Sequence, residues 1–263
     1  MSKALMTIHG FLTSTKDFGR LYDYLDFYDE VKAVEVPGHN HDEPDFSLFN
    51  VEDTYKTVLA AYEELRSKHD QVDVVGFSMG GSLTSWLCSV KDVHRAVLLA
   101  PANKYINLML AFDASKFYGS LGIKTYRQQS GNLSTKLDAT DDAYNPYREN
   151  LATSAKLFWE RFLRHLNPHT YSVFSKIIRK NNIVVETMSP IKTPALVIYG
   201  KLDEMVPYSS VKFVLNNFSN AKESIYPDLG HLLLYGNGDH LVIGEILDFL
   251  SEGTVQKEIP ARE

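Results

Sequence analysis

Short apolar runs alternate along the chain with longer segments in which apolar residues recur every three or four positions. Six runs are short and apolar enough to be strands, and they cover residues 4–8, 31–36, 72–75, 96–99, 195–199 and 222–226. Between the second and third runs, Val51, Tyr55, Val58, Tyr62 and Leu65 recur at helical spacing, and the segment 240–252 has the same character. The alternation predicts an α/β fold with a mostly parallel sheet of about six strands and helices on both faces.

One long segment breaks this alternation. From about residue 103 to residue 188 the pattern becomes helical, polar and rich in aromatic residues, and the segment is too long for a loop. We therefore expect a core made of residues 1–102 and 189–263, with residues 103–188 inserted as a helical cap that has helices near 145–165 and 168–180. Some cap aromatics should face a pocket and the others should form the core of the cap: Phe112, Phe117, Tyr118, Tyr126, Phe158, Trp159 and Phe162.

Composition narrows the class of protein. The chain has 263 residues, of which 44% are hydrophobic, enough for one large domain with an insertion. Its 27 Lys and Arg against 33 Asp and Glu give a net charge of −6, and no long basic run is present, so nucleic acid is not an expected partner. The first ten residues contain too short an apolar run for a signal peptide, and no run is long enough to span a bilayer. These features favour a cytoplasmic protein, and nothing in them indicates an oligomeric state.

A serine sits among glycines at the end of the third apolar run. In VDVVGFSMGGS, Gly76 and Gly80 flank Ser78 two residues away on either side, a valine-rich strand precedes them and a helix-forming segment follows. A sharp strand-to-helix turn gives the central residue strained backbone angles, and side chains two positions away would collide in it. We therefore expect Ser78 to lie at a strand-to-helix junction.

A serine hydroxyl needs a base to become a nucleophile, and the base needs an orienting acid. Asp203 follows the fifth strand in YGKLDEMVP, and His231 follows the sixth in YPDLGHLLL. Functional groups of open parallel sheets collect at the carboxyl ends of the strands, where all three residues fall. Asp228, three residues before His231, is an alternative acid, although a role in the turn is favoured. His240, expected near the start of the last helix, is a less favoured alternative base.

An anion that forms on the substrate would need hydrogen-bond donors. The backbone amide of Met79, at the start of the helix, faces the Ser78 hydroxyl, and a second amide should come from Phe11 in the loop IHGFLTS after the first strand.

These motifs together resemble the α/β-hydrolase family: GFSMG as G-x-S-x-G, the loop HGF, the acid in GKLDEMVP and the histidine in LGH, in the family's chain order. The resemblance covers the sheet and omits the cap, and it is strongest to small bacterial carboxylesterases and monoacylglycerol-lipase-like hydrolases. It implies Ser78 as nucleophile, His231 as base, Asp203 as orienting acid, and the amides of Phe11 and Met79 as an oxyanion hole. The chain begins directly with the strand before HGF, so six strands are expected in place of the eight of larger members.

Other polar residues have structural interpretations. His9 ends a buried strand, and we expect it to hold the following loop by hydrogen bonds. His39 and His41, near Asp42 and Asp45, lack a firm metal-ligand spacing, so a solvated loop is favoured over a metal site. Cys88, the one cysteine, is expected to be a buried hydrophobe, and neither a metal nor a cofactor is implied.

The sequence thus predicts a serine hydrolase that cleaves carboxylic esters with short to medium acyl chains. Thioesterase, acyl-transfer and carbon–carbon hydrolase activities use the same residues and stay open, as does a signalling receptor or ligand-binding protein that keeps the hydrolase fold.

Overall fold

The structure is a computed structural model, and it describes residues 2–40, 44–107, 167–203, 205–235, 238–255 and 257–261. Six strands form one sheet: β1 Lys3–Ile8, β2 Glu30–Val34, β3 Gln71–Phe77, β4 Ala96–Leu99, β5 Ala195–Gly200 and β6 Ala221–Tyr226. The helices are η1 Thr15–Tyr24 and η2 Phe46–Leu48, both of the 3₁₀ type, and α1 Val51–Lys68, α2 Met79–Val90, α6 Pro168–Met188, α7 Tyr208–Asn217 and α8 Asp239–Ser251.

All neighbouring strands run parallel, in the order β2-β1-β3-β4-β5-β6. Each of the six predicted strands is present, and the α/β class and the six-stranded sheet are confirmed. The order reverses direction at β1 and β3, so the carboxyl ends of these two strands lie side by side in the middle of the sheet. Ligands of open parallel sheets bind at such a reversal.

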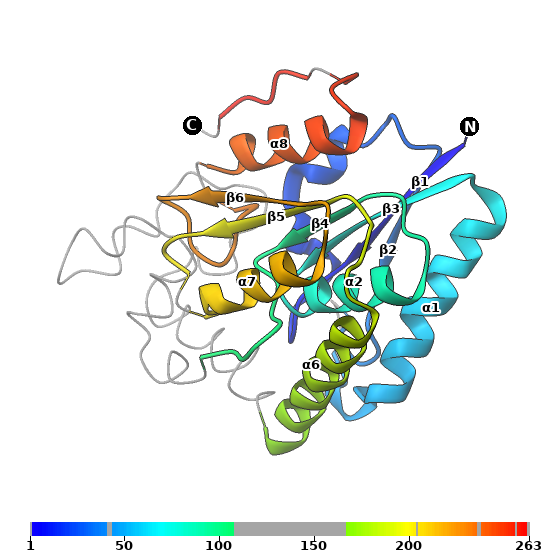
Figure 1. Ribbon diagram of the computed structural model, residues 1–263, viewed down its shortest axis with the longest axis vertical. Helices are drawn as coiled ribbons and strands as arrows, with labels where there is room; N and C mark the ends of the chain where they lie inside the picture. The colour runs from blue at the N-terminus through cyan, green and yellow to red at the C-terminus, as the bar shows by residue number, and fades with distance from the viewer. Residues whose placement is uncertain are drawn as a thin grey trace.

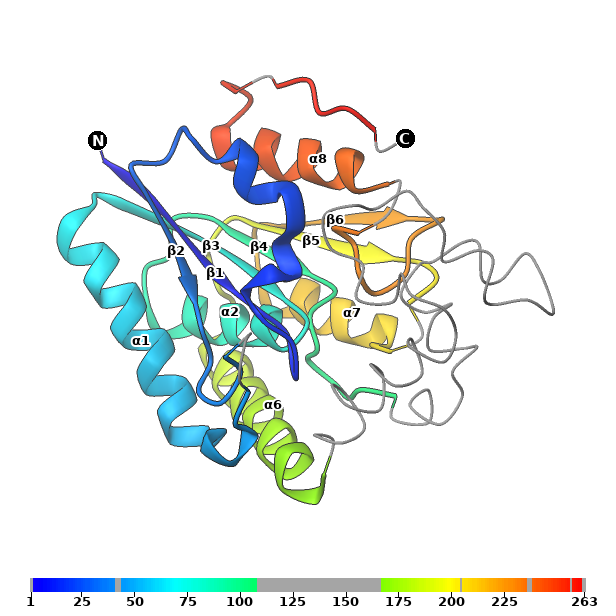
Figure 2. The same cartoon turned by 180° about the vertical axis from the view of Figure 1, so that it is seen from behind.

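Helices cover both faces of the sheet (Figure 1). One face carries α1, α2 and α7, with α6 packed against α2 and α1, and the other carries α8 and η1 (Figure 2). Alternate residues of the four central strands β1, β3, β4 and β5 therefore enter different cores: Met6 and Ile8 lie in the core under α2, whereas Leu5 lies in the core under α8 and η1. Burial on both faces explains why the runs of these four strands are mostly apolar, whereas the edge strands β2 and β6 are partly exposed.

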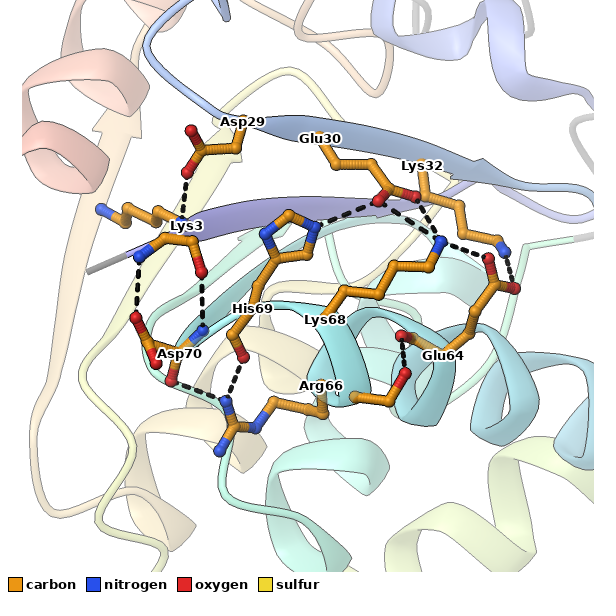
Figure 3. A network of polar contacts seen from close by, with 11 residues as sticks. Lys3, Asp29, Glu30, Lys32, Glu64, Arg66, Lys68, His69 and Asp70 are labelled. Carbon is orange, nitrogen blue, oxygen red and sulfur yellow. Dashed lines mark hydrogen bonds and ion pairs between the residues drawn. The ribbon is translucent and has the colours of Figure 1, made fainter.

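The carboxyl end of α1 is tied to the edge of the sheet by charged side chains (Figure 3). Lys68 Nζ lies 2.9 Å from Glu64 Oε1 and 3.4 Å from Glu30 Oε1, and His69 Nε2 lies 3.0 Å from Glu30 Oε2. Lys32 of β2 contacts Glu64 as well. The lysine and glutamate side chains are partly exposed to solvent, so each pair contributes little, about 0–1 kcal/mol.

The helix predicted over 168–180 is present and extends to Met188. Asn167 caps its first turn, and buried residues such as Ile177 and Val185 face α2 and α1. The helix predicted near 145–165 and the seven cap aromatics lie outside the described residues, so the division into core and cap stays a prediction.

Residues 257–261, which follow α8, contact η1 and the segment after it. Pro260 O accepts a hydrogen bond of 3.1 Å from Arg20, and Lys257 forms an ion pair with Asp26. The same Arg20 holds the buried Asp239 at the start of α8 through two hydrogen bonds of 2.6 and 3.0 Å. Arg20 thus joins η1, α8 and the tail. None of the helices in the described ranges is both long and apolar enough to cross a bilayer.

Candidate active site

Ser78 lies between the last residue of β3 and the first residue of α2. Its backbone angles, φ 52° and ψ −113°, lie in a region that residues other than glycine rarely adopt. The surrounding chain fixes this conformation: Ser78 N donates to Leu99 O at 2.9 Å, and Ser78 O accepts from Ala102 N at 2.9 Å. The predicted strained turn is therefore present, and its strain is held by β4 and the loop that follows it.

The glycines flanking Ser78 are required by close backbone contacts. A Cβ atom on Gly76 would lie 2.3 Å from Gly80 O, and one on Gly80 would lie 1.9 Å from Ile8 O. The first contact confirms the predicted collision across the turn. The second shows that the start of α2 presses directly on the end of β1, which brings the turn at Ser78 beside the loop that begins at His9.

Asp203 and His231 meet at the carboxyl ends of β5 and β6. His231 Nδ1 lies 2.7 Å from Asp203 Oδ2, and both side chains are buried. The other carboxylate oxygen, Oδ1, accepts hydrogen bonds from the amides of Met205 at 2.8 Å and Val206 at 2.9 Å. Because Nδ1 donates to the carboxylate, the neutral imidazole keeps its lone pair on Nε2. This is the arrangement a general base needs.

The alternative acid and base lie elsewhere. Asp228 is exposed, and the carboxylate at His231 Nδ1 is that of Asp203. His240 is in the first turn of α8, as expected.

The aromatic ring of Phe77 connects His231 to the turn. Its centroid lies 4.9 Å from the His231 ring centroid, and Phe77 immediately precedes Ser78. A Cβ atom on Gly10 would lie 3.2 Å from the same Phe77 ring. The segments around Gly10, Ser78 and His231 are therefore contiguous, and they come from the ends of β1, β3 and β6.

His9 holds the loop after β1 through hydrogen bonds. Val36 N donates to His9 Nε2 at 3.0 Å, so Nδ1 carries the proton and donates to Gly10 O at 2.8 Å. Burial lowers the pKa of His9 to about 4, which keeps this ring neutral. The Gly10 carbonyl and the Phe11 amide belong to one trans peptide and point in opposite directions, so fixing the carbonyl also aims the Phe11 N–H. The predicted structural role of His9 agrees with these contacts.

The second predicted donor is the backbone amide of Met79. Met79 opens α2, and the first amides of a helix have no partner within it. The partial positive charge of the helix end reinforces such an amide as an anion donor.

A family model described as alpha/beta hydrolase fold matches residues 3–237. The chain belongs to this family. One curated relative, the uncharacterized hydrolase YugF of Bacillus subtilis (strain 168), is 26% identical over 266 residues, which cover 95% of this chain and 88% of the relative.

Solved structures share the fold of this α/β hydrolase at low sequence identity. A monoacylglycerol lipase of Paleococcus ferrophilus superposes with a TM-score of 0.62 at 17% identity, covering 95% of each chain. A soluble variant of the monoglyceride lipase of Saccharomyces cerevisiae gives 0.65 at 15%, covering 96% of this chain and 88% of the lipase. A structure from the metagenome-derived lipolytic enzymes LipS and LipT gives a TM-score of 0.66 at 17% identity, covering 95% of this chain and 94% of the other.

Two further predictions about this α/β hydrolase concern histidine and cysteine. His39 is 1% exposed and contacts the rings of His9, Phe46 and Phe49. The prediction of a solvated loop is therefore wrong at this residue. His41 and Asp42 lie outside the described residues. Cys88 is buried, as predicted, and burial raises its pKa to about 12. Within the described part of the chain, no cluster of three or more His, Cys, Asp or Glu could hold a metal ion.

Sequence reasoning missed Asp17, a buried carboxylate in η1 whose Oδ2 accepts from Gly10 N at 3.0 Å. The sequence contains only a weak indication of this contact, an Asp four residues after Thr13 in the segment that follows HGF.

Proposed function

We propose that this α/β hydrolase cleaves carboxylic esters through an acyl-enzyme intermediate. Ser78 Oγ attacks the ester carbonyl while His231 Nε2 takes its proton, and Asp203 stabilises the imidazolium that forms. The amides of Phe11 and Met79 stabilise the negative charge on the carbonyl oxygen. The imidazolium then returns the proton to the leaving alcohol, and water, activated in the same way, releases the acid.

The observation that carries this proposal is the hydrogen bond between His231 and Asp203, next to the ring of Phe77, which immediately precedes Ser78. Asp203 and His231 come from the ends of β5 and β6, and Ser78 itself occupies a strained backbone conformation. Strain held in place by neighbouring segments is typical of functional positions.

Esters are the favoured substrates because several structural neighbours are lipolytic enzymes or monoacylglycerol lipases. We propose a preference for short to medium acyl chains. Each buried methylene contributes roughly 0.8 kcal/mol, and this gain stops once the chain exceeds a pocket closed by a cap at residues 103–188.

A panel of p-nitrophenyl esters with increasing acyl length, run beside an amide and a thioester, tests the proposal. We expect continuous turnover, a maximum at short to medium chains and no jump in rate when substrate forms an emulsion. Best activity on long-chain triglyceride emulsions would contradict the chain-length proposal, and absence of turnover on every ester would contradict the reaction.

A second candidate is hydrolysis of a carbon–carbon bond in a diketone. Two structural neighbours are variants of the meta-cleavage product hydrolase CumD, one of them described from Pseudomonas fluorescens IP01. Each matches with a TM-score of 0.59 at 18% identity. Including a vinylogous diketone in the panel separates the two reactions. A receptor or binding protein would instead release product once per molecule or very slowly.

A further inference from the structure

Asp17 places a second carboxylate next to the site, and the proposed mechanism does not use it. Its side chain is 9% exposed, and a single oxygen, Oδ2, accepts from Gly10 N at 3.0 Å and from Thr13 Oγ1 at 2.5 Å. These two donors bracket Phe11 and Leu12, so the carboxylate closes a ring across the turn that presents the Phe11 amide.

The turn held in this way is strained and crowded. Leu12 has φ 57°, a conformation that branched and bulky residues avoid, and a Cβ on Gly10 would lie 3.1 Å from Thr13 Oγ1. Gly10 is thus fixed at both of its backbone polar groups, its N–H by Asp17 and its C=O by His9. With both peptides of Gly10 fixed, the direction of the Phe11 N–H follows.

We propose that Asp17 is a positioning residue that holds the turn 10–13 so that the Phe11 amide faces the substrate carbonyl oxygen. This inference rests on the proposed function, because it assigns the turn to the oxyanion hole. Asp17 acts through Gly10 and Thr13 and does not itself touch the substrate.

The electrostatics of Asp17 agree with a functional role. Burial raises the pKa of Asp17 to about 6, and the hydrogen bonds from Thr13 and Gly10 and the charge of protonated His231 lower it in part. Tyr22 also interacts with Asp17, whose charge contributes to raising the pKa of Tyr22. An acid whose pKa is raised on folding stabilises the fold below its unfolded value, 3.8, and this stabilisation is lost as the pH rises through 6. The ionised carboxylate is therefore costly at neutral pH, which core packing alone does not explain.

The test compares Asp17→Ala with Asp17→Asn, using Asp23→Asn, an exposed position of η1, as the matched control. Asp17→Ala removes both hydrogen bonds to the turn, and we expect kcat to fall about 100-fold with KM changed less than about threefold, because an oxyanion donor acts in the transition state. Asp17→Asn keeps an oxygen that accepts both bonds, so it should recover at least about tenfold of that loss. Thermal unfolding at pH 7 should show both variants folded. A wild-type kcat in Asp17→Ala, or a loss confined to KM, would overturn the inference.

A measurement independent of activity uses the one His-Gly pair in the sequence, residues 9–10. Labelling with 13C-carbonyl histidine and 15N-glycine leaves a single carbonyl-correlated amide signal, that of Gly10. This signal should titrate with a midpoint near 6 in the wild type and lose that transition in Asp17→Asn. If wild-type protein hydrolyses no ester, the proposed function fails, and the titration still decides whether Asp17 holds Gly10. A Gly10 signal that does not titrate would overturn the inference.

Discussion

Replacing Asp203 by asparagine tests the orientation of His231 at the level of single atoms. Asp203 Oδ1 accepts two backbone amides, from Met205 and Val206, and only an oxygen can take both. The asparagine carbonyl must therefore occupy that position, and its NH₂ then faces His231 Nδ1. Two donors cannot face each other, so the imidazole shifts its proton to Nε2, the nitrogen that must accept from Ser78. The base is lost although the fold keeps both backbone hydrogen bonds.

The expected cost is large. A wrong tautomer of a triad histidine lowers kcat by about 10⁴-fold, equivalent to about 5.4 kcal/mol in the activation barrier. The assay is kcat/KM on a short-chain p-nitrophenyl ester, with the unfolding temperature measured in parallel. Asp228→Asn is the control, since Asp228 is exposed and the carboxylate bonded to His231 Nδ1 is that of Asp203, and it should stay within about threefold of wild type. Equal losses in the two variants, or a loss below about tenfold in Asp203→Asn, would refute the reasoning.

Three further predictions concern the nucleophile, an ion pair and acid stability. Ser78→Ala should lower ester turnover by several powers of ten with normal folding, and a phosphonate probe should label the wild type at Ser78 alone; labelling elsewhere would contradict the assignment. Arg20→Gln leaves the buried Asp239 without its guanidinium partner, and we expect the protein to lose about 2–3 kcal/mol of stability. For a 263-residue chain this lowers the unfolding temperature by about 5 °C, against about 1 °C or less for Lys68→Gln at an exposed pair. Equal shifts in unfolding temperature would count against a stabilising buried pair. Burial lowers the pKa of His9 from 6.5 to about 4, so stability present above pH 6.5 is lost as the pH falls toward 4, by up to about 3 kcal/mol. Urea unfolding at a series of pH values gives the free energy of unfolding, which should fall more steeply with acidification in the wild type than in His9→Gln. The same pH dependence in both proteins would exclude His9 as a cause.

The sheet and the converging site residues could be predicted from sequence because their signals are local. Short β-branched runs favour strands through their own residues. Gly76 and Gly80 are needed about Ser78 because side chains at these positions would collide with the backbone within a five-residue turn. The parallel sheet then places Asp203 and His231 at one edge, since each follows a strand directly.

The features that sequence could not predict depend on distant partners. His39 lies in a charged loop, and it is buried only because Phe46 and Phe49 fold back over its ring. The second half of α6 is rich in β-branched residues, which favour strands weakly over helices, and packing of Val185 against neighbouring helices decides its state. Asp17 becomes recognisable only when Gly10 is seen to donate to it.

The link from Arg20 to both Asp239 and Pro260 has a consequence for how the protein is made. These partners lie 219 and 240 residues apart in the chain, so η1 cannot gain its ion pair until synthesis is nearly complete. Contacts of such long sequence separation form late and slowly. The segment that carries Asp17 should therefore be the last part of the proposed site to fold during synthesis, and nascent chains that lack α8 should remain inactive even when β1 to β6 and His231 have been made.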